Sequence, residues 1–329
     1  MQHEDWGTRA DRWTGTRSEV VAVHGTDVHV LRRDAAVGAP PDAPTQLLVH
    51  GLGGSSSNWL EVMTALSEHG PVVAPDLPGF GRTRPPGPRA SRTPINARFL
   101  RAFARTLGLE RVVLHGNSMG GLLGVLFAGL EPDRVERLVL VDPALPGPLR
   151  ASRSIAPKTL ARFAPFVVPP IGRAGLKLAW QRGTGESLWQ ETVDFVHGDP
   201  GRISPEIAAL GAESLDWGRE QPWRLDGFVE AATSVVRAVT IDRRRIGAAI
   251  DRVDAPTLLL WGDADRLVGR AVVDGLVDRR PDWDVHVFET VGHVPQLEAP
   301  GDYVEVVRRW LDEGDDAPGI DSVAEAAGA

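Results

Sequence analysis

The sequence contains no cysteine, which excludes disulfide bonds, thiolate metal sites and a cysteine nucleophile. Lysine is almost absent too, because only Lys158 and Lys177 occur among the 36 basic residues. No stretch approaches the roughly 20 uninterrupted apolar residues that a membrane span requires. Residues 1–17 are polar and lack the apolar run of a signal peptide. We therefore expect a cytoplasmic protein without a membrane span.

The acidic balance of the chain is concentrated at its end. The formal net charge is −8, and six acidic residues of the last segment account for most of it: Asp312, Glu313, Asp315, Asp316, Asp321 and Glu325. The rest of the chain is close to neutral, so nothing in it indicates a nucleic-acid-binding surface. Residues 313–329 are rich in acidic residues, glycine and alanine, which predicts a disordered tail.

Short apolar runs alternate with helical patterns over much of the chain. Strands are expected at 20–23 and 28–31 (a hairpin), 46–49, 71–74, 111–114, 137–141, 257–261 and 283–288. Most are short continuous apolar runs, which are typical of parallel strands that are buried on both faces. A closing helix is expected at 301–311. The pattern predicts an α/β fold with a mostly parallel sheet.

Residues 147–250 interrupt this alternation and contain no convincing strand pattern. Helical patterns occur there around 157–168, 171–181, 187–196, 204–213 and 226–246. We therefore expect an inserted helical lid at 147–250 between two parts of one core, at 18–146 and 251–312. An irregular arm at residues 1–17 precedes the core.

The most informative motif is Gly116-Asn117-Ser118-Met119-Gly120, which lies between a strand pattern and a helix pattern. A serine on a sharp strand-to-helix turn needs small residues two positions away on either side, and two glycines satisfy that need. Such a turn would lift the hydroxyl of Ser118 above the edge of the sheet. The N–H groups at the start of the following helix would favour negative charge at the same place. Ser118 is therefore the candidate nucleophile.

A serine hydroxyl is a poor nucleophile until an imidazole takes its proton and a carboxylate orients that imidazole. In this topology both partners should follow the serine along the chain, each at the carboxyl end of a strand. His293 lies in a loop just past the last expected strand and is the candidate base. Spacing alone leaves the acid open between Asp263 and Asp265, which share a loop, and Asp142 is a third candidate.

Two further histidines lie close to strand ends, and we expect structural roles for both. His50 precedes the serine in a glycine-rich loop that is better suited to shaping the backbone. His115 abuts the elbow on the strand side, where a packed or hydrogen-bonded side chain is expected.

An oxyanion needs two backbone donors. Met119 N–H, immediately after the nucleophile, is one candidate. The other should come from the loop after the strand at 46–49, where Gly51, Gly53 and Gly54 allow the backbone to approach a ligand closely. Leu52 N–H is our choice in this loop.

Five motifs in this order resemble those of the α/β-hydrolase superfamily, specifically its lid-bearing serine hydrolases. In chain order they are His50-Gly51-Leu52-Gly53-Gly54, Asp76-Leu77-Pro78-Gly79-Phe80-Gly81, Gly116-Asn117-Ser118-Met119-Gly120-Gly121, Gly262-Asp263-Ala264-Asp265 and Gly292-His293 with Glu298-Ala299-Pro300. The resemblance spans residues 20–312 and implies a mostly parallel eight-stranded sheet, flanked by helices, with an inserted lid. The Gly-x-x-Asp form of the fourth motif selects Asp265 as the family's acid.

The resemblance implies an esterase-like serine hydrolase that cleaves a carboxylic ester or related acyl compound through an acyl-enzyme on Ser118. It implies no metal and no organic cofactor. Apolar and tryptophan residues of the expected lid suggest a small or medium hydrophobic acyl or ester substrate. A serine at position 118 argues against epoxide hydrolases and haloalkane dehalogenases, which use an aspartate nucleophile.

Three other activities stay open. The elbow with Asn117 resembles that of enzymes that hydrolyse C–C bonds in ring-fission products. Those enzymes usually carry tryptophan after the catalytic histidine, where this chain has Val294. Cofactor-free perhydrolases share the Ser-Asp-His set, and a ligand-binding receptor with slow turnover could retain it.

Overall fold

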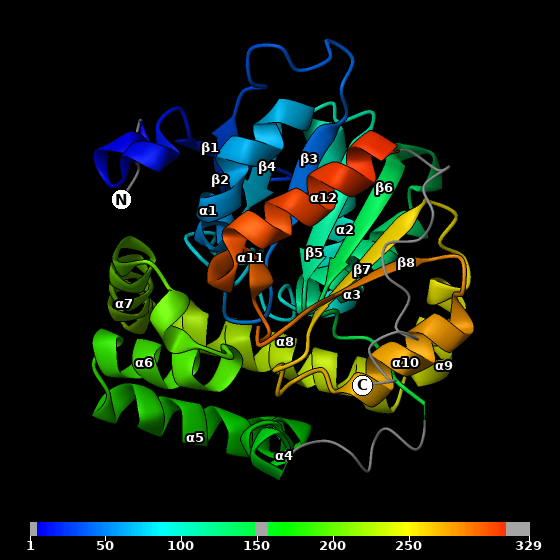
Figure 1. Ribbon diagram of the computed structural model, residues 1–329. Coiled ribbons are helices and arrows are strands. Elements are labelled where there is room, and N and C mark those ends of the chain that lie inside the picture. The colour runs from blue at the N-terminus through cyan, green and yellow to red at the C-terminus, as the bar shows by residue number, and fades with distance from the viewer. Residues whose placement is uncertain (1–4, 149–156, 314–329) are drawn as a thin grey trace.

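The computed structural model of the protein describes residues 5–148 and 157–313 (Figure 1). Within them, eight strands form one sheet in the order β1-β2-β4-β3-β5-β6-β7-β8. The strands are β1 Arg17–Val23, β2 Thr26–Arg33, β3 Thr45–Val49, β4 Val72–Pro75, β5 Val112–Asn117, β6 Val135–Val141, β7 Thr257–Gly262 and β8 Asp284–Phe288. The pairs β1–β2 and β2–β4 are antiparallel, and all other neighbours are parallel. The predicted mostly parallel, eight-stranded sheet is confirmed.

The sequence patterns of the strands follow from their places in the sheet. Every residue of β4, β5 and β7 is buried, as expected for strands with helices on both faces. The edge strand β1 is only partly buried. It turns into β2 through His24 and Gly25, which both have positive φ angles of 47° and 80°. Two positive φ angles in a two-residue loop suit the twist of a β-hairpin.

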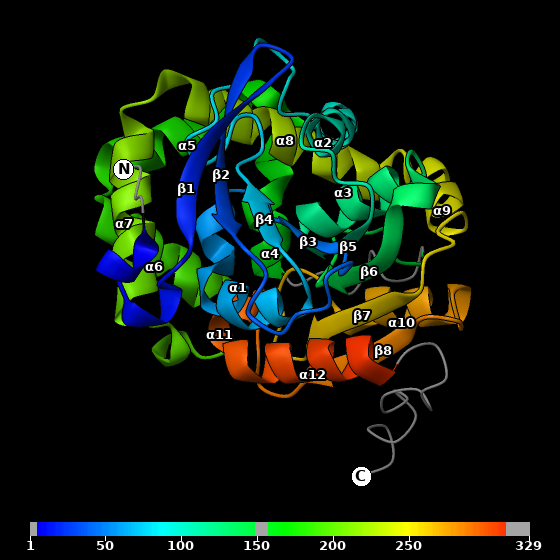
Figure 2. The same cartoon turned by 90° about the horizontal axis from the view of Figure 1, so that it is seen from above.

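Helices cover both faces of the sheet (Figure 2). One apolar layer joins the sheet to α2 Thr93–Thr106, α3 Met119–Ala128 and α10 Arg270–Arg279. The other joins it to α1 Leu60–Leu66, α11 Pro295–Glu298 and α12 Pro300–Glu313. Of the predicted tail at 313–329, only Glu313, which ends α12, lies within the described residues.

Among the described residues, six α-helices lie between β6 and β7: α4 Pro157–Phe163, α5 Pro169–Arg182, α6 Gly185–Val196, α7 Pro205–Arg219, α8 Pro222–Thr240 and α9 Arg243–Ile250. Figure 1 shows α4 to α8 gathered at one end of the sheet. The single helical pattern at 226–246 is two helices, because the chain turns at Asp242 before α9 begins. Ile246 and Ile250 of α9 pack in the same apolar layer as α3, and so do Ala231 and Ala238 of α8, so both of these helices contact the core.

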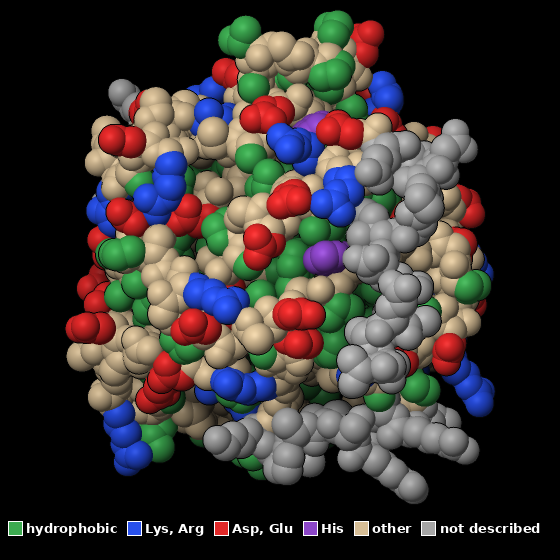
Figure 3. Space-filling view, viewed as in Figure 1, with side chains coloured by type: hydrophobic (Ala, Val, Ile, Leu, Met, Phe, Trp, Pro, Cys, Tyr) green, Lys and Arg blue, Asp and Glu red, His purple; other side chains and the backbone are tan. Residues whose placement is uncertain are grey.

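The amino-terminal arm contains two short 3₁₀ turns, Trp6–Thr8 and Asp11–Trp13, rather than irregular chain alone. The side chain of Trp13 is fully buried against the α1 side of the sheet. Acidic and basic side chains intermingle over the face in Figure 3. Across the described residues, no helix combines the length and apolar character needed to cross a membrane.

Candidate active site

Ser118 lies on a tight turn between β5 and α3. Its φ angle of 54° is in a region that non-glycine residues rarely occupy. Such backbone strain costs about 1–3 kcal/mol and is found mainly at functional sites. A side chain at Gly116 would overlap the carbonyl group of Gly120, and one at Gly120 would overlap that of Val49. The glycines thus let the backbone fold back, and the side chain of Ser118 stays partly exposed.

His293 is held from three sides in the loop after β8. Its Nδ1 lies 2.7 Å from Oδ2 of Asp265, and its backbone N–H donates to Val196 O at 2.7 Å. Its carbonyl accepts a 2.9 Å bond from Nδ2 of Asn117, the residue before the nucleophile. A carboxylate that accepts from Nδ1 leaves Nε2 as the basic nitrogen of a neutral imidazole.

The two aspartates of the loop after β7 have different surroundings. Asp265 is buried and accepts from Leu267 N–H at 2.6 Å with its other oxygen. Asp263 is exposed and accepts from Thr290 N–H at 2.6 Å. The geometry therefore favours Asp265 as the partner of His293, and Asp263 holds the turn that follows β8.

Asp142, the third candidate, lies beside this pair at the end of β6. One oxygen each of Asp142 and Asp265 and a ring nitrogen of His293 lie within 4.8 Å of one another. The Asp142 side chain is fully buried and accepts from Gly262 N–H at 3.1 Å. Burial, and then the nearby charge of Asp265, raise the pKa of Asp142 well above its usual value. This raised pKa favours the protonated, neutral form of Asp142 beside the His293–Asp265 pair.

The glycine loop after β3 lies against the elbow. A Cβ atom added to Gly51 would be 3.1 Å from Cβ of Ser118. Met119 is the first residue of α3, so its N–H has no intrahelical acceptor. Neither Met119 N–H nor Leu52 N–H has a hydrogen-bond partner among the described residues. Both donors are thus available near the nucleophile.

The two remaining histidines of interest are structural. His50 Nδ1 contacts Gly51 O at 2.8 Å, and its Nε2 accepts from Leu77 N–H at 3.1 Å. Burial lowers the pKa of His50 and keeps it neutral. His115 bonds to Tyr303 Oη at 2.7 Å and Gln46 Oε1 at 2.9 Å. Burial lowers the pKa of His115 to about 3, so it too is uncharged.

An apolar group of side chains covers the glycine loop after β3 from the side of the inserted helices. A Cβ atom on Gly53 would lie 3.1 Å from the ring of Phe228 in α8. Phe228 belongs to a small cluster that joins the loop to several inserted helices: Leu52, Phe163, Phe166, Leu176, Phe228, Val229 and Ala232. We call this the roof cluster.

Sequence reasoning missed the role of Glu298, which it treated only as part of a helix-start motif. The buried carboxylate accepts three backbone N–H groups, from Gly292 at 2.9 Å, Gly198 at 3.1 Å and Asp199 at 2.7 Å. Gly292 precedes the histidine, while the other two follow α6. Glu298 therefore ties the histidine loop to the inserted helices. Nothing in the local sequence marks this role, because its donors lie about a hundred residues apart along the chain.

A sheet of this order, with a strained serine on the turn after β5 and a buried His–Asp pair after β8 and β7, defines an α/β-hydrolase. Residues 44–300 match the family model of the alpha/beta hydrolase fold. The chain belongs to this family and is a hydrolase, which confirms the resemblance.

Curated relatives include different hydrolases. A 2-hydroxy-6-oxononadienedioate/2-hydroxy-6-oxononatrienedioate hydrolase of Burkholderia vietnamiensis is 30% identical over 295 residues, which are 88% of this chain and 93% of the relative. Lipase 3 of a Moraxella species is 26% identical over 267 residues, 81% of this chain and 76% of the lipase.

Solved structures show the same fold. A haloalkane dehalogenase from Agrobacterium tumefaciens superposes with a TM-score of 0.76 at 19% identity and covers 93% of this chain and 99% of its own. A meta-cleavage product hydrolase from Pseudomonas fluorescens superposes with a TM-score of 0.67 at 21% identity, covering 90% and 97%. At these identities the likeness concerns the fold alone.

Proposed function

We propose that the protein is a serine hydrolase that cleaves a carboxylic ester or a related acyl compound through an acyl-enzyme on Ser118. The observation that carries the proposal is the buried His293–Asp265 pair, with its 2.7 Å bond, together with the 2.9 Å bond that joins the His293 carbonyl to Asn117, the residue before a serine on a strained turn. This is the arrangement that converts a serine hydroxyl into a nucleophile.

In the proposed reaction Ser118 Oγ attacks the acyl carbon while Nε2 of His293 takes its proton. Asp265 stabilises the imidazolium that forms, and the N–H groups of Leu52 and Met119 bind the oxyanion. His293 then gives its proton to the leaving alcohol. A water molecule, activated by the same histidine, releases the acid from Ser118. None of these steps requires a metal ion or organic cofactor.

The roof cluster supports an apolar acyl group as the substrate of this site. Three phenylalanines and aliphatic side chains lie next to the proposed oxyanion donor Leu52, and none of the members can pair with a charged substrate group. We propose that α4 to α8 act as the lid that selects the substrate.

Hydrolysis of a C–C bond in a ring-fission product is the second candidate. It is favoured by the 30% identity to the Burkholderia vietnamiensis hydrolase and by Asn117 in the elbow. Such diacid substrates bind through basic side chains, whereas the side chains that pack against Leu52 in the roof cluster are apolar. The ester reaction is therefore our first choice.

The test is a panel of 4-nitrophenyl esters with acyl chains of increasing length, assayed with the wild type and Ser118→Ala. We expect turnover by the wild type and a loss of about 10⁴-fold or more in Ser118→Ala. A 2-hydroxy-6-oxodienoate is assayed in parallel. Cleavage of that compound without ester turnover would replace the first candidate by the second. Ester turnover that survives Ser118→Ala would refute the mechanism.

A further inference from the structure

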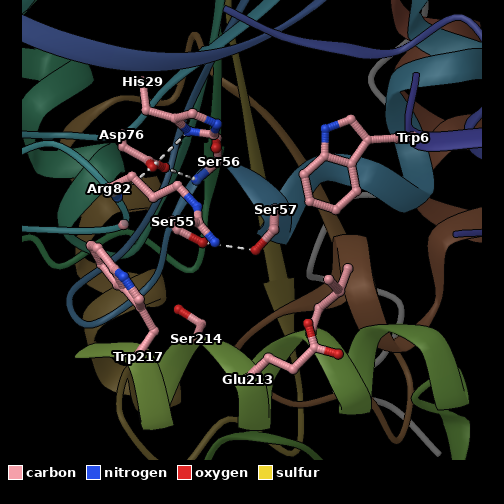
Figure 4. A pocket seen from close by; sticks show the side chains of 12 residues that line it. Trp6, His29, Ser55, Ser56, Ser57, Asp76, Arg82, Glu213, Ser214 and Trp217 are labelled. Atoms are coloured by element: carbon pink, nitrogen blue, oxygen red, sulfur yellow. Dashed lines mark hydrogen bonds and ion pairs between the residues drawn. The ribbon is translucent and has the colours of Figure 1, made fainter. Parts of the chain in front are cut away.

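A cavity lies between the amino-terminal arm, the loop after β3 and helix α7 (Figure 4). Its volume is about 50 Å³, and none of its lining residues belongs to the candidate active site. The walls that matter here come from Trp6, Ser55, Ser57, Arg82, Ser214 and Trp217. A water molecule needs roughly 10–15 Å³ of such space, so the cavity can hold a group of a few heavy atoms.

The guanidinium group of Arg82 reaches into this cavity without a hydrogen-bond acceptor. Figure 4 shows it extending from the loop after β4 toward the serines. The backbone N–H of Arg82 donates to Asp76 at 2.8 Å, and its side chain stacks 5.1 Å from the ring centre of Trp217. Within the described part of the chain, no carboxylate or carbonyl accepts from its five N–H groups. Burial lowers the pKa of Arg82, as expected for a cation partly removed from water.

The acidic groups around the cavity are already engaged elsewhere. Asp76 accepts from His29 Nδ1 at 2.8 Å and from Ser56 N–H at 2.7 Å, in addition to the backbone of Arg82. Glu213 forms an ion pair with Arg9 at 2.6 Å. The nearby Arg224 donates to the carbonyl of Gly81. Arg82 is therefore left as the cation that lacks a direct anionic partner in this wall.

Hydroxyl and aromatic groups complete the cavity. Ser55 and Ser57 share one hydrogen bond, Oγ to Oγ at 2.7 Å, so one of the two hydroxyl protons remains available to a ligand. Ser214 adds a third hydroxyl from α7, and the rings of Trp6 and Trp217 supply apolar walls (Figure 4). This combination offers charged and neutral donors at one end and an apolar surface beside them.

We propose that this cavity is a binding site for a short-chain monocarboxylate. The carboxylate accepts from the guanidinium of Arg82 and from the serine hydroxyls, and the carbon chain lies against the tryptophans. A planar carboxylate matches the fork of a guanidinium, and such bonds are stronger than neutral ones. A single negative charge fits better than two, because Asp76 and Glu213 line the cavity and repel an anion in proportion to its charge.

The site can be tested directly with 3,3,3-trifluoropropionate as a probe, by ¹⁹F NMR line broadening on the purified full-length protein at constant ionic strength. We expect broadening that unlabelled propionate reverses and that inorganic phosphate at pH 7.5 reverses at least tenfold less well. Phosphate that competes as well as propionate would overturn the assignment to a monocarboxylate.

Arg82→Met keeps the aliphatic stem and removes the charge, so it should weaken probe binding about tenfold or more. The matched control is Arg84→Met, which removes an exposed arginine two residues away and should leave binding unchanged. Arg82→Lys and Ser57→Ala are milder changes that should each weaken binding several-fold, and they replace Arg82→Met if it does not fold. Binding that is insensitive to all changes at Arg82 and Ser57, or equally sensitive to Arg84→Met, would overturn the proposal. Either result would mean that the probe binds elsewhere on the protein, for example at the proposed oxyanion donors.

Discussion

Replacing Asp142 by asparagine should stabilise the protein increasingly as the pH rises. In the folded protein the carboxyl group is buried beside Asp265, and its pKa is raised well above the ordinary value of 3.8. Asparagine has nearly the same shape and is always neutral. Its oxygen can accept from Gly262 N–H, as Asp142 does at 3.1 Å, and its amide can donate toward Asp265. The substitution therefore removes a titration and keeps the contacts.

The sign and size follow from proton linkage. Below pH 3.8 both the folded and the unfolded chain carry the proton, and Asp142 contributes its full stability. Between that pH and the raised pKa of the folded state, folding must take up a proton, so the free energy of unfolding falls as pH rises. The slope reaches about 1.4 kcal/mol per pH unit for one proton. Asp142→Asn does not titrate, so its stability relative to the wild type should grow by up to about that amount per pH unit until the pKa of folded Asp142 is reached.

Urea unfolding at pH 5, 6, 7 and 8 measures this difference, with the exposed Asp133→Asn as the control. The free energy of unfolding of the control should change with pH in the same way as that of the wild type. Parallel curves for Asp142→Asn as well would show that the pKa of Asp142 is not raised in the folded protein and would refute the argument. The variant should keep kcat within about threefold, whereas a loss near 10⁴-fold would make Asp142 the catalytic acid.

Three further changes test the site. Asp265→Asn should lower kcat by about 10⁴-fold, because it disturbs the tautomer of His293. The kcat of the neighbouring Asp263→Asn should stay within about threefold of the wild type. The reverse result would show that Asp263, and not Asp265, is the acid. Glu298→Gln places an amide where three backbone N–H groups converge. It should lower the free energy of unfolding, measured in urea, by about 1–3 kcal/mol and should also lower kcat. The control Glu305→Gln, at an exposed position, should change neither quantity. Gly116→Ala forces a Cβ atom into the carbonyl group of Gly120, so it should lower the free energy of unfolding by more than about 3 kcal/mol or abolish folding. Gly175 in α5 has open space around it, so Gly175→Ala should raise the free energy of unfolding by up to about 1 kcal/mol. An unchanged unfolding midpoint in Gly116→Ala would contradict the turn geometry.

The sheet could be predicted from sequence because its strands bury both faces. The apolar runs of β5 and β7 occur where every residue is buried, so local hydrophobicity and tertiary burial agree. The ends of the helices were harder to predict from the sequence. Helical spacing continues through Asp242, whereas the structure ends α8 at Thr240 and begins α9 at Arg243.

The choice of the acid shows where spacing stops being informative. Asp263 and Asp265 are two residues apart in one loop, and both are compatible with a position near His293. The loop directs one inward to the imidazole and the other outward to Thr290 N–H. The family motif could select Asp265, but residue patterns alone could not. The neutral state of Asp142 was equally hidden, because it depends on burial next to a second carboxylate.

The parts of the site that no local pattern predicts are those in which the inserted helices meet the core. Glu298 binds both the histidine loop and the turn after α6, and His293 itself donates to Val196 O at the end of α6. Motifs at strand ends specify chemistry because each lies within a few residues of sequence. Substrate selection instead depends on surfaces such as the roof cluster, assembled from the loop after β3 and inserted helices more than a hundred residues later. Because another of the inserted helices, α6, holds the histidine loop, changes that shift the inserted helices together are expected to alter the position of His293 as well.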